Sequence, residues 1–368
     1  MGKKASSRFD GPVVPGPPSF GDMRILFLHS GDRVPSARFR ALPVARRLRQ
    51  AGHRCTLASS FPQKYDYFPW LGFRPSQALK RIVRFAHLVL ARLRRYDVVV
   101  LDRELFDNPT VAMEERFRKA VKRLILDVDD GIFLRYPEKF ARLAQMADHV
   151  VAGNRFLADK ARTYNECVSV IPTCIELDDY PQRSPDDGAQ SPIIIGWIGT
   201  HANVPYLAIV APALRRLAQR HRIELRIVAS SADPLQDLDL QGVPFRFVPW
   251  QGEHEVREIL QFHIGLMPLP ADQQWTRYKC GLKLLQYMAV GLPAVASPVG
   301  VNAEIVQHGM NGYLATTVTE WEEALAALIV DPEKRLQLGT EARRTVKSRY
   351  SVEVNLARYL EVFQAPST

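Results

Sequence analysis

Short apolar segments recur along this chain, and helix-forming stretches separate them. In the first half these segments lie at residues 23–30, 97–102, 123–129, 149–154 and 168–173. Strands that alternate with helices pair in parallel and form a doubly wound sheet with helices on both faces. The alternation therefore predicts an α/β fold with a Rossmann-like parallel sheet in the first half.

The alternation starts again after residues 181–191, a stretch rich in Pro, Asp and Ser. The later segments lie at residues 193–199, 224–230, 245–250, 263–269, 293–297 and 312–315. A chain of 368 residues is also longer than one hydrophobic core usually organises. We therefore expect a flexible tail (1–22), two Rossmann-like domains (23–180 and 192–348), a linker (181–191) and a final helical segment (349–368). Ligands of open α/β sheets bind beyond the carboxyl ends of the strands, so the cleft between the domains is the expected site.

The charge balance favours an anionic partner. The chain carries 49 Lys and Arg against 39 Asp and Glu, a net charge of +10. A nucleic acid, a membrane surface or a phosphorylated substrate would each suit this charge. No nucleic-acid-binding motif and no platform of aromatic and basic residues is found in the sequence, so we expect no nucleic acid partner.

Residues 78–97 predict a basic amphipathic helix when the sequence is wound at about 100° per residue. One arc carries Lys80, Arg81, Arg84, Arg92, Arg94 and Arg95. The opposite arc carries Leu79, Ile82, Val83, Ala86, Val89, Leu90 and Leu93. We expect the apolar arc to pack on the sheet, and the basic arc either to be solvated or to contact anionic lipid headgroups.

The sequence shows no segment that targets the chain to a membrane interior. No apolar run approaches the ~20 residues that span a bilayer, and the first residues lack the apolar part of a signal peptide. The four cysteines lack the spacing of a zinc site or of a disulfide framework. We therefore expect a cytoplasmic protein, with peripheral contact at the inner face of the membrane as an open option.

Two lysines and a glycine precede a short apolar helix in the stretch YKCGLKLLQYMAVGLPAVASPVG, residues 278–300. A helix that begins at Leu282 after Gly281 presents unpaired N–H groups and a partial positive charge at its first turn. Lys279 and Lys283 add full charges beside it. This corner suits an anion such as a diphosphate; the alternative is a surface helix whose lysines are merely solvated.

The segment from Tyr278 to Leu314 resembles the nucleotide-sugar-binding region of the retaining GT-B glycosyltransferases of family 4. The matching residues are Gly281, Leu284, Leu285, Met288, Ala289, Gly291, Pro293, Val295, Ala296, Ser297, Glu304, Gly309 and Gly312. IIIGWIGT at 193–200 resembles the opening of that family's second domain, and VSVIPTCIELDDY at 168–180 resembles its interdomain segment. Weaker similarity extends the resemblance over about 300 residues.

The resemblance implies a glycosyltransferase that moves a sugar from a nucleotide sugar to a glycan or lipid-linked acceptor, with retention, in cell-envelope, polysaccharide or glycoconjugate synthesis. It implies no metal and no other cofactor, and it implies that a helix at 352–363 crosses back to the first domain. The donor-binding residues that it implies are Gly199, Thr200, Tyr278, Lys279, Gly281, Leu282, Lys283, Leu284 and Gln286.

The chain departs from the family's pattern at two places. The family usually has two glutamates eight positions apart, and Tyr278 and Gln286 stand at those positions here. The family's Arg and Lys after the first strand of the second domain are missing from GTHANVPYL at 199–207. Lys283 and Lys279 are expected to supply that charge from the other side of the phosphates. A relative that binds nucleotide sugars but has impaired catalysis remains an alternative.

The first domain should provide the acceptor side of the cleft. Acidic residues follow one predicted strand in LILDVDDGIF, and we expect Asp127, Asp129 and Asp130 to be catalytic together with Lys283. The expected acceptor-facing or phosphate-facing residues are Gly31, Arg38, Arg40 and Arg103. Three alternatives for the acidic run remain: a turn capped by Asp130, a metal-binding Asp-x-Asp, and a haloacid-dehalogenase-type phosphatase with Asp127 as nucleophile and Asp129 as acid/base.

Overall fold

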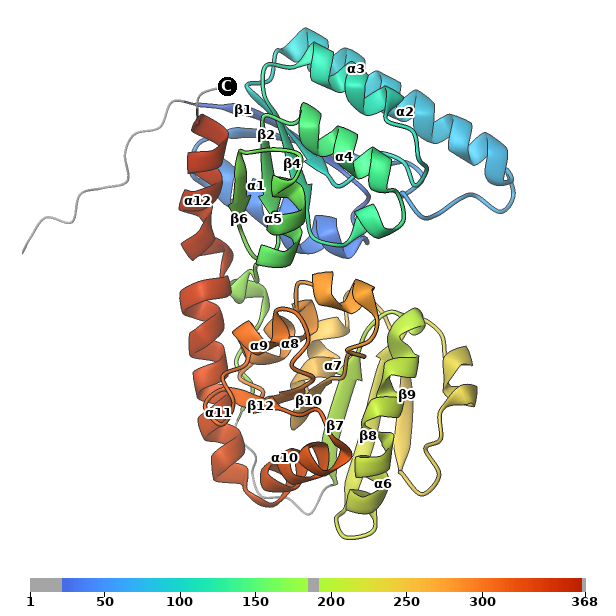
Figure 1. Cartoon of the computed structure of the whole chain (residues 1–368), viewed down its shortest axis with the longest axis vertical. Helices are drawn as coiled ribbons and strands as arrows, with labels where there is room; N and C mark the ends of the chain where they lie inside the picture. Colours follow the sequence, from blue (N-terminus) through green and yellow to red (C-terminus); the bar gives the residue numbers. More distant parts are fainter. Residues whose placement is uncertain (1–21, 185–191, 366–368) are drawn as a thin grey trace, which may run out of the picture.

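The computed structural model describes residues 22–184 and 192–365, and its two parallel sheets lie one above the other in Figure 1. Each sheet has six strands and is covered by helices. This arrangement confirms the predicted class, an α/β protein with two doubly wound parallel sheets. The predicted tail at 1–22 and the predicted linker at 181–191 lie outside the described residues, apart from Asp22 and residues 181–184.

The first sheet has the strand order β2-β1-β3-β4-β5-β6, and all of its neighbouring strands are parallel. Its strands are β1 (Arg24–His29), β2 (Arg54–Ser59), β3 (Val98–Asp102), β4 (Leu124–Val128), β5 (His149–Ala152) and β6 (Val168–Val170). The helices around it are α1 (Leu42–Gln50), α2 (Phe73–Arg94), α3 (Ala112–Ala120), α4 (Pro137–Met146) and α5 (Arg155–Arg162). Strands β3 and β4 are buried along their whole length, as is typical of parallel strands covered on both faces.

The second sheet has the strand order β12-β11-β10-β7-β8-β9 and is also parallel. Its strands are β7 (Ile193–Ile198), β8 (Ile223–Ala229), β9 (Phe245–Pro249), β10 (Ile264–Met267), β11 (Ala294–Ala296) and β12 (Gly312–Leu314). The helices of this half are α6 (Ala211–Ala218), α7 (Glu255–Leu260), α8 (Leu282–Ala289), α9 (Asn302–Ile305), α10 (Val318–Val330) and α11 (Pro332–Thr345). In each sheet the carboxyl ends of the strands lead into the loops that form the cleft between the halves.

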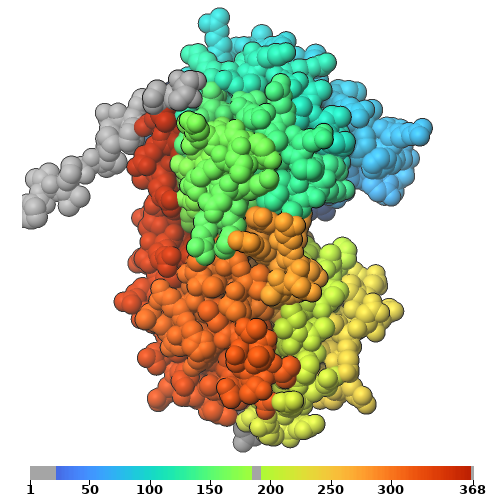
Figure 2. Space-filling model, viewed as in Figure 1, coloured from blue at the N-terminus to red at the C-terminus, as the bar shows by residue number. Residues whose placement is uncertain are grey.

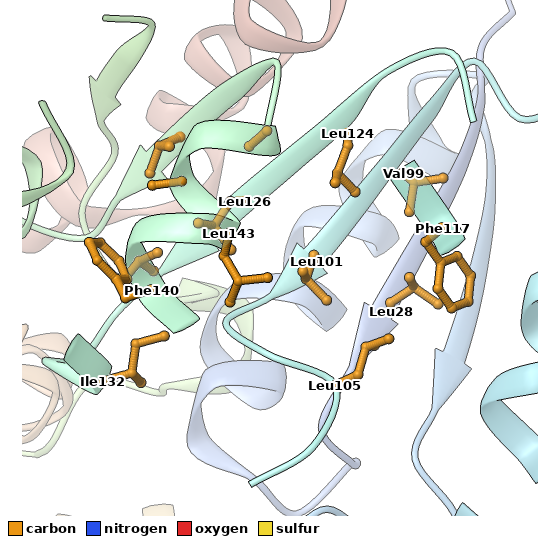
Figure 3. Close-up of a cluster of buried hydrophobic side chains, with 14 of the residues drawn as sticks. Leu28, Val99, Leu101, Leu105, Phe117, Leu124, Leu126, Ile132, Phe140 and Leu143 are labelled. Atoms are coloured by element: carbon orange, nitrogen blue, oxygen red, sulfur yellow. The ribbon is translucent and has the colours of Figure 1, made fainter. Parts of the chain in front are cut away.

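A hydrophobic core beneath one face of the first sheet positions those loops (Figure 3). Leu101 of β3 and Leu126 of β4 pack in one cluster with Phe117 of α3 and Phe140 of α4, and each of these side chains is fully buried. Burying a large apolar side chain contributes about 1.5 to 3 kcal/mol. This packing holds β3 and β4 in register and thereby fixes where the acidic residues after β4 emerge.

The last helix, α12 (Val352–Gln364), returns to the first sheet, and with α11 it forms a column along one side of both halves (Figure 1). The hydroxyl of Ser351 caps its first turn by accepting a hydrogen bond from the Val354 N–H at 3.4 Å. Its buried face joins Ile25 and Phe27 of β1, and the rings of Phe27 and Phe363 meet edge to face at 6.4 Å. Helix α12 therefore packs on β1.

The prediction for the orientation of α2 was wrong. We expected its apolar arc to pack on the sheet, but part of the basic arc is buried instead. Lys80 and Arg84 are buried, although both were expected on a solvent-facing basic arc. Arg84 donates to the carbonyls of Ala58 and His29 at 2.8 and 2.7 Å, and Lys80 donates to those of Lys64 and Asp66 at 2.7 and 2.6 Å. Arg84 thus satisfies carbonyls at the ends of β1 and β2, and Lys80 satisfies carbonyls of the loop that follows β2. With these cations turned inward, the helix exposes much of its apolar arc.

Candidate active site

A cavity of about 550 Å³ lies between the carboxyl ends of the two sheets. The first half contributes Arg33, Pro35, Arg38, Phe39, Asp129, Asp130 and Thr173. The second half contributes Ile198, Gly199, Thr200, Ala202, Asn203, Ser230, Trp250, Glu255, Met267, Trp275, Lys279, Cys280, Gly281, Leu282, Lys283 and Gln286. The cavity lies at the interdomain position predicted from the sequence and is large enough for a small organic ligand.

The first turn of α8 points into this cavity. Gly281 precedes the helix with φ +68°, a left-handed conformation that favours glycine, and a Cβ there would lie 2.3 Å from Ile305 Cδ1. The backbone therefore turns sharply at Gly281, and the unpaired N–H groups of the following turn face the cleft. This geometry is the one that the sequence predicted for an anion site.

Lys283 reaches across the cavity to the end of β7. Its ammonium lies over the Trp197 ring, 5.1 Å from the centroid. A Cβ on Gly199 would lie 2.5 Å from Lys283 Cε, so a side chain at position 199 would exclude the lysine from this place. Burial and then the neighbouring Lys279 lower the pKa of Lys283 to about 7. An anion bound between the two lysines would relieve their repulsion and raise that pKa again.

Gln286 is connected to a carboxylate from another helix. Its Nε2 donates to Tyr180 Oη at 3.1 Å and forms a short hydrogen bond to Glu255 Oε1. Glu255 also accepts from Trp250 Nε1 at 2.7 Å. Arg38, from the short helix η1 (Ala37–Ala41) of the first half, donates to both oxygens of Glu255 at 3.1 and 3.2 Å. Glu255 thus places a carboxylate beside Gln286, although residue 286 is itself an amide. The pair of Glu255 with Arg38 links the two halves.

Asp129 and Asp130 face the lysines from the end of β4. Burial and the neighbouring Asp129 raise the pKa of Asp130 to about 6, against the opposing effect of Lys279. Burial also raises the pKa of Asp129, and Arg103 opposes that shift with its Nε 3.5 Å from Asp129 Oδ1. Arg103 is buried and has φ +57°, a strained conformation for a residue other than glycine. It does not line the cavity and instead positions Asp129.

Asp127 lies beneath the cavity wall. Its carboxylate accepts a bidentate pair of hydrogen bonds from Arg40, with Nε to Oδ2 at 3.0 Å and Nη2 to Oδ1 at 2.6 Å. Arg40 also donates to the Ile171 carbonyl at 3.1 Å, and both side chains are buried. Burial raises the pKa of Asp127 although Arg40 opposes the shift. The geometry of the Arg40–Asp127 pair is therefore that of a buried structural ion pair. Asp127 is not accessible to a substrate, which argues against the phosphatase alternative, where it would be the nucleophile.

Three other expected site residues lie away from the cavity. Leu284 is fully buried in the core of the second half. The Tyr278 ring packs edge to face on Phe133 at 4.7 Å, so this residue joins the two halves at the position where the family has a glutamate. Gly31 has φ +136°, and a Cβ there would lie 2.6 Å from the Gln63 side chain, so a neighbouring side chain occupies the space beside it.

Several residues of the cavity were not predicted. Ser230 and Trp250 directly follow β8 and β9, so the rule that sites lie at carboxyl ends of strands would have found them. Arg33 lies in the loop after β1, where the same rule points. Glu255 has no such signal, because its place depends on how the two halves meet. Within residues 22–184 and 192–365, no group of three or more His, Cys, Asp or Glu side chains is arranged to hold a metal ion. None of the helices described is both long and apolar enough to cross a membrane.

Comparison with solved structures identifies the fold. HepE from Anabaena, solved in complex with UDP, superimposes with a TM-score of 0.66 at 16% identity, covering 94% of this chain and 100% of that chain. Sucrose-phosphate synthase from Thermosynechococcus elongatus gives a TM-score of 0.66 at 14% identity, covering 92% of this chain and 98% of that chain. The two facing sheets with a cleft between them therefore have the GT-B fold.

Comparison of sequences relates the second half of the chain to one family. Residues 192–331 match the model of the family Glycosyl transferases group 1. A stretch of 85 residues is 32% identical to N-acetyl-alpha-D-glucosaminyl L-malate synthase of Bacillus anthracis, covering 23% of this chain and 22% of that protein. The match thus spans about a fifth of the length of the curated relatives. The second half of the chain is therefore similar to the group 1 glycosyltransferases, the family that the resemblance implied.

Proposed function

We propose that this protein transfers a sugar from a nucleoside diphosphate sugar to a glycan or lipid-linked acceptor, with retention of configuration. The observation that carries the proposal is the first turn of α8, where Lys283 and Lys279 lie at the helix N-terminus inside the interdomain cavity. The donor diphosphate would lie there, with Gly199 and Thr200 at its other side. UDP is the first nucleotide to test, because HepE has been solved with UDP and with UDP-glucose.

The geometry suits departure of a nucleoside diphosphate. Cleavage of a glycosyl phosphate bond places negative charge on the leaving diphosphate, and fixed cations and helix N–H groups stabilise that charge without rearranging. Lys283, Lys279 and the first turn of α8 would do this. The acceptor would enter from the side of Asp129 and Asp130 and attack the face from which the diphosphate leaves. A phosphate oxygen would then accept the acceptor's proton, so no protein nucleophile is needed.

We also propose that transfer needs no divalent metal and that the protein acts in cell-envelope, polysaccharide or glycoconjugate synthesis on the cytoplasmic side of the membrane. The lysines and the helix already provide the positive charge that a metal would bring to the diphosphate. Cys55, Cys167, Cys174 and Cys280 are all free, which supports a reducing compartment.

The decisive experiment measures UDP binding and transfer separately. Lys283→Ala should weaken UDP binding in calorimetry by about 1.5 to 3 kcal/mol, the range for hydrogen bonds to charged groups. Lys347→Ala, which changes an exposed lysine outside the cleft, is the matched control and should bind normally. Equal affinity for the wild type and Lys283→Ala would contradict the proposed donor site.

The binding-only alternative is tested by the same protein. Incubation with UDP-sugars and candidate glycan or lipid acceptors, with and without EDTA, should give product at the same rate in both conditions. Tight UDP binding with no product from any donor would instead favour a relative with impaired catalysis. That outcome would follow from the replacement of the family's two glutamates by Tyr278 and Gln286.

A further inference from the structure

Most of the large apolar side chains that the described structure exposes gather in one region of the first half. Fourteen such side chains are exposed, and nine of them lie between Phe61 and Leu93. Trp70 and Leu93 are 80% and 77% exposed. We call this set the α2 surface, and it consists of Phe61, Tyr65, Tyr67, Trp70, Phe73, Ile82, Phe85, Val89 and Leu93. Figure 2 shows the segment, in light blue, projecting from the side of the upper half.

The exposure follows from how α2 is seated. Ile82, Phe85, Val89 and Leu93 recur at intervals of three or four residues and therefore form one stripe along the helix. The buried side of the same helix carries Lys80 and Arg84, whose hydrogen bonds to strand-end and loop carbonyls fix its rotation. The stripe cannot turn inward without removing those buried cations from their partners. Exposed apolar patches of this extent mark interaction sites.

The charges around the stripe identify the kind of partner. Helix α2 contains no Asp or Glu. The exposed cations on it and at its C-cap are Arg74, Arg81, Arg92, Arg94 and Arg95. An apolar stripe bordered by arginines, with Trp and Tyr beside it, has the composition of a helix that lies in the interface of a bilayer. Arginine side chains can extend their apolar stems along such a surface while the guanidinium reaches the phosphates.

We propose that the α2 surface docks this protein on an anionic lipid bilayer, with the stripe at the boundary between headgroups and acyl chains and the arginines on headgroup phosphates. This goes beyond the proposed function, because docking requires neither a donor nor transfer. The α2 surface also adjoins the cleft, since Arg33, which lines the cavity, pairs with Asp66 of the loop before α2 at 2.6 Å. Docking would therefore hold the opening of the cleft near the membrane and close to an acceptor embedded there.

Sedimentation of the full chain with vesicles tests the proposal. The probes are vesicles of phosphatidylcholine alone and vesicles of equal parts phosphatidylcholine and phosphatidylglycerol, at low and high salt. We expect binding to the anionic vesicles at low salt, weakened by high salt because screening removes the arginine contribution. Failure of the wild type to bind anionic vesicles at low salt would overturn the proposal.

Two variants separate the apolar and the charged contributions. Trp70→Ala with Ile82→Gln and Leu93→Gln should lower binding about tenfold or more at either salt concentration, because the inserted apolar area is lost. Arg81→Gln with Arg92→Gln should lower it about tenfold at low salt and much less at high salt. The matched control changes exposed residues of the second half, Val330→Gln with Leu336→Gln and Arg246→Gln, and should bind like the wild type.

Folding and self-association are checked with the same proteins. All variants change exposed side chains, so their melting temperatures and UDP affinities should match those of the wild type, and a loss of vesicle binding then reports the surface alone. If the α2 variants sediment like the wild type, the proposal is wrong. If the wild type forms a dimer that the α2 variants abolish, and does not bind vesicles, a second copy of the chain covers this surface and the membrane proposal is also wrong.

Discussion

At the scale of single residues, the cleft contains a lysine whose pKa is lowered and an aspartate whose pKa is raised, so both pKa values lie near neutral pH. Burial and Lys279 lower the pKa of Lys283 to about 7. Burial and Asp129 raise the pKa of Asp130 to about 6. Both shifts disfavour the charged form in the free protein. Groups with shifted pKa values are common in binding sites, where a ligand provides the missing charge partner. Before the ligand binds, these unpaired groups lower the stability of the free protein.

The shift of Lys283 predicts a pH dependence of nucleotide binding. A diphosphate favours the ammonium form, so it raises the pKa of Lys283 toward the ordinary value. Affinity for UDP should therefore be highest below about pH 7 and should fall by up to tenfold per unit as the pH rises toward about 9. Calorimetry of the wild type and of Lys283→Met across this range is the measurement. The ratio of the two affinities cancels the titration of UDP itself, and a ratio that does not change with pH would contradict the prediction.

The shift of Asp130 predicts a stabilising substitution. The folded pKa is raised to about 6, so at neutral pH the carboxylate is ionised in both states and only the folded state bears the burial and the repulsion. Asp130→Asn should raise the free energy of unfolding at neutral pH by about 1 to 3 kcal/mol. The gain should shrink as the pH falls through about 6 and vanish below about pH 4, where the acid is neutral in both states.

Denaturant unfolding at several pH values measures this effect. Asp159→Asn, a change at a carboxylate that is 68% exposed, is the matched control and should stay within about 0.5 kcal/mol of the wild type. A more stable Asp130→Asn variant that transfers sugar more slowly would show that this carboxylate is kept for function. An Asp130→Asn variant that is no more stable than the wild type at neutral pH would mean that the cleft solvates this group well.

At the scale of secondary structure elements, the predictions from sequence succeeded where burial produces a continuous apolar run. Strands β3 and β4 are such runs, and so are β7 and β10, and all four were predicted. Strand β2 was missed because it is an edge strand whose residues are mostly half-buried, so its sequence RCTLAS carries little apolar signal. The other edge strands β6, β9 and β12 were predicted, so the weak apolar signal of β2, and not its edge position alone, explains why it was missed.

Helix α2 shows why the orientation of a helix is harder to predict from sequence than the presence of the helix. Its two arcs were predicted correctly from the periodicity, but charge was assumed to face solvent. Arg84 instead donates to strand-end carbonyls of β1 and β2, which are buried acceptors that need a partner. Those carbonyls are 26 and 55 residues away in sequence, so no local pattern reveals them. The same limit explains why Lys283 was predicted in the site from its own segment, whereas Glu255 was not.

At the scale of the whole molecule, the two halves are held together by contacts of unequal burial. Arg38 and Glu255 pair across the cleft with 23% and 5% of their side chains exposed. Arg155 and Glu304 also pair between the halves, with 62% and 38% exposed. Asn154 Nδ2 donates to the Tyr278 carbonyl at 2.9 Å near the second pair. These contacts hold the two halves closed against each other, and losing one partner of the buried pair should cost more than losing one partner of the exposed pair.

This difference predicts unequal effects of removing the two arginines. Arg38→Met leaves Glu255 buried with only Trp250 and Gln286 as donors, which should weaken the closed arrangement by about 1 to 3 kcal/mol because a buried charged acceptor loses partners. Arg155→Met removes an exposed pair worth about 0 to 1 kcal/mol and is the matched control. Glu255 can regain water only if the cleft opens, so small-angle scattering should show a larger radius of gyration for Arg38→Met and an unchanged one for Arg155→Met.

Adding Glu255→Gln to Arg38→Met removes the unpaired charge and should restore closure in part. An Arg38→Met protein as compact as the wild type would show that α12 and the Tyr278 contacts, and not the buried ion pair, hold the two halves together.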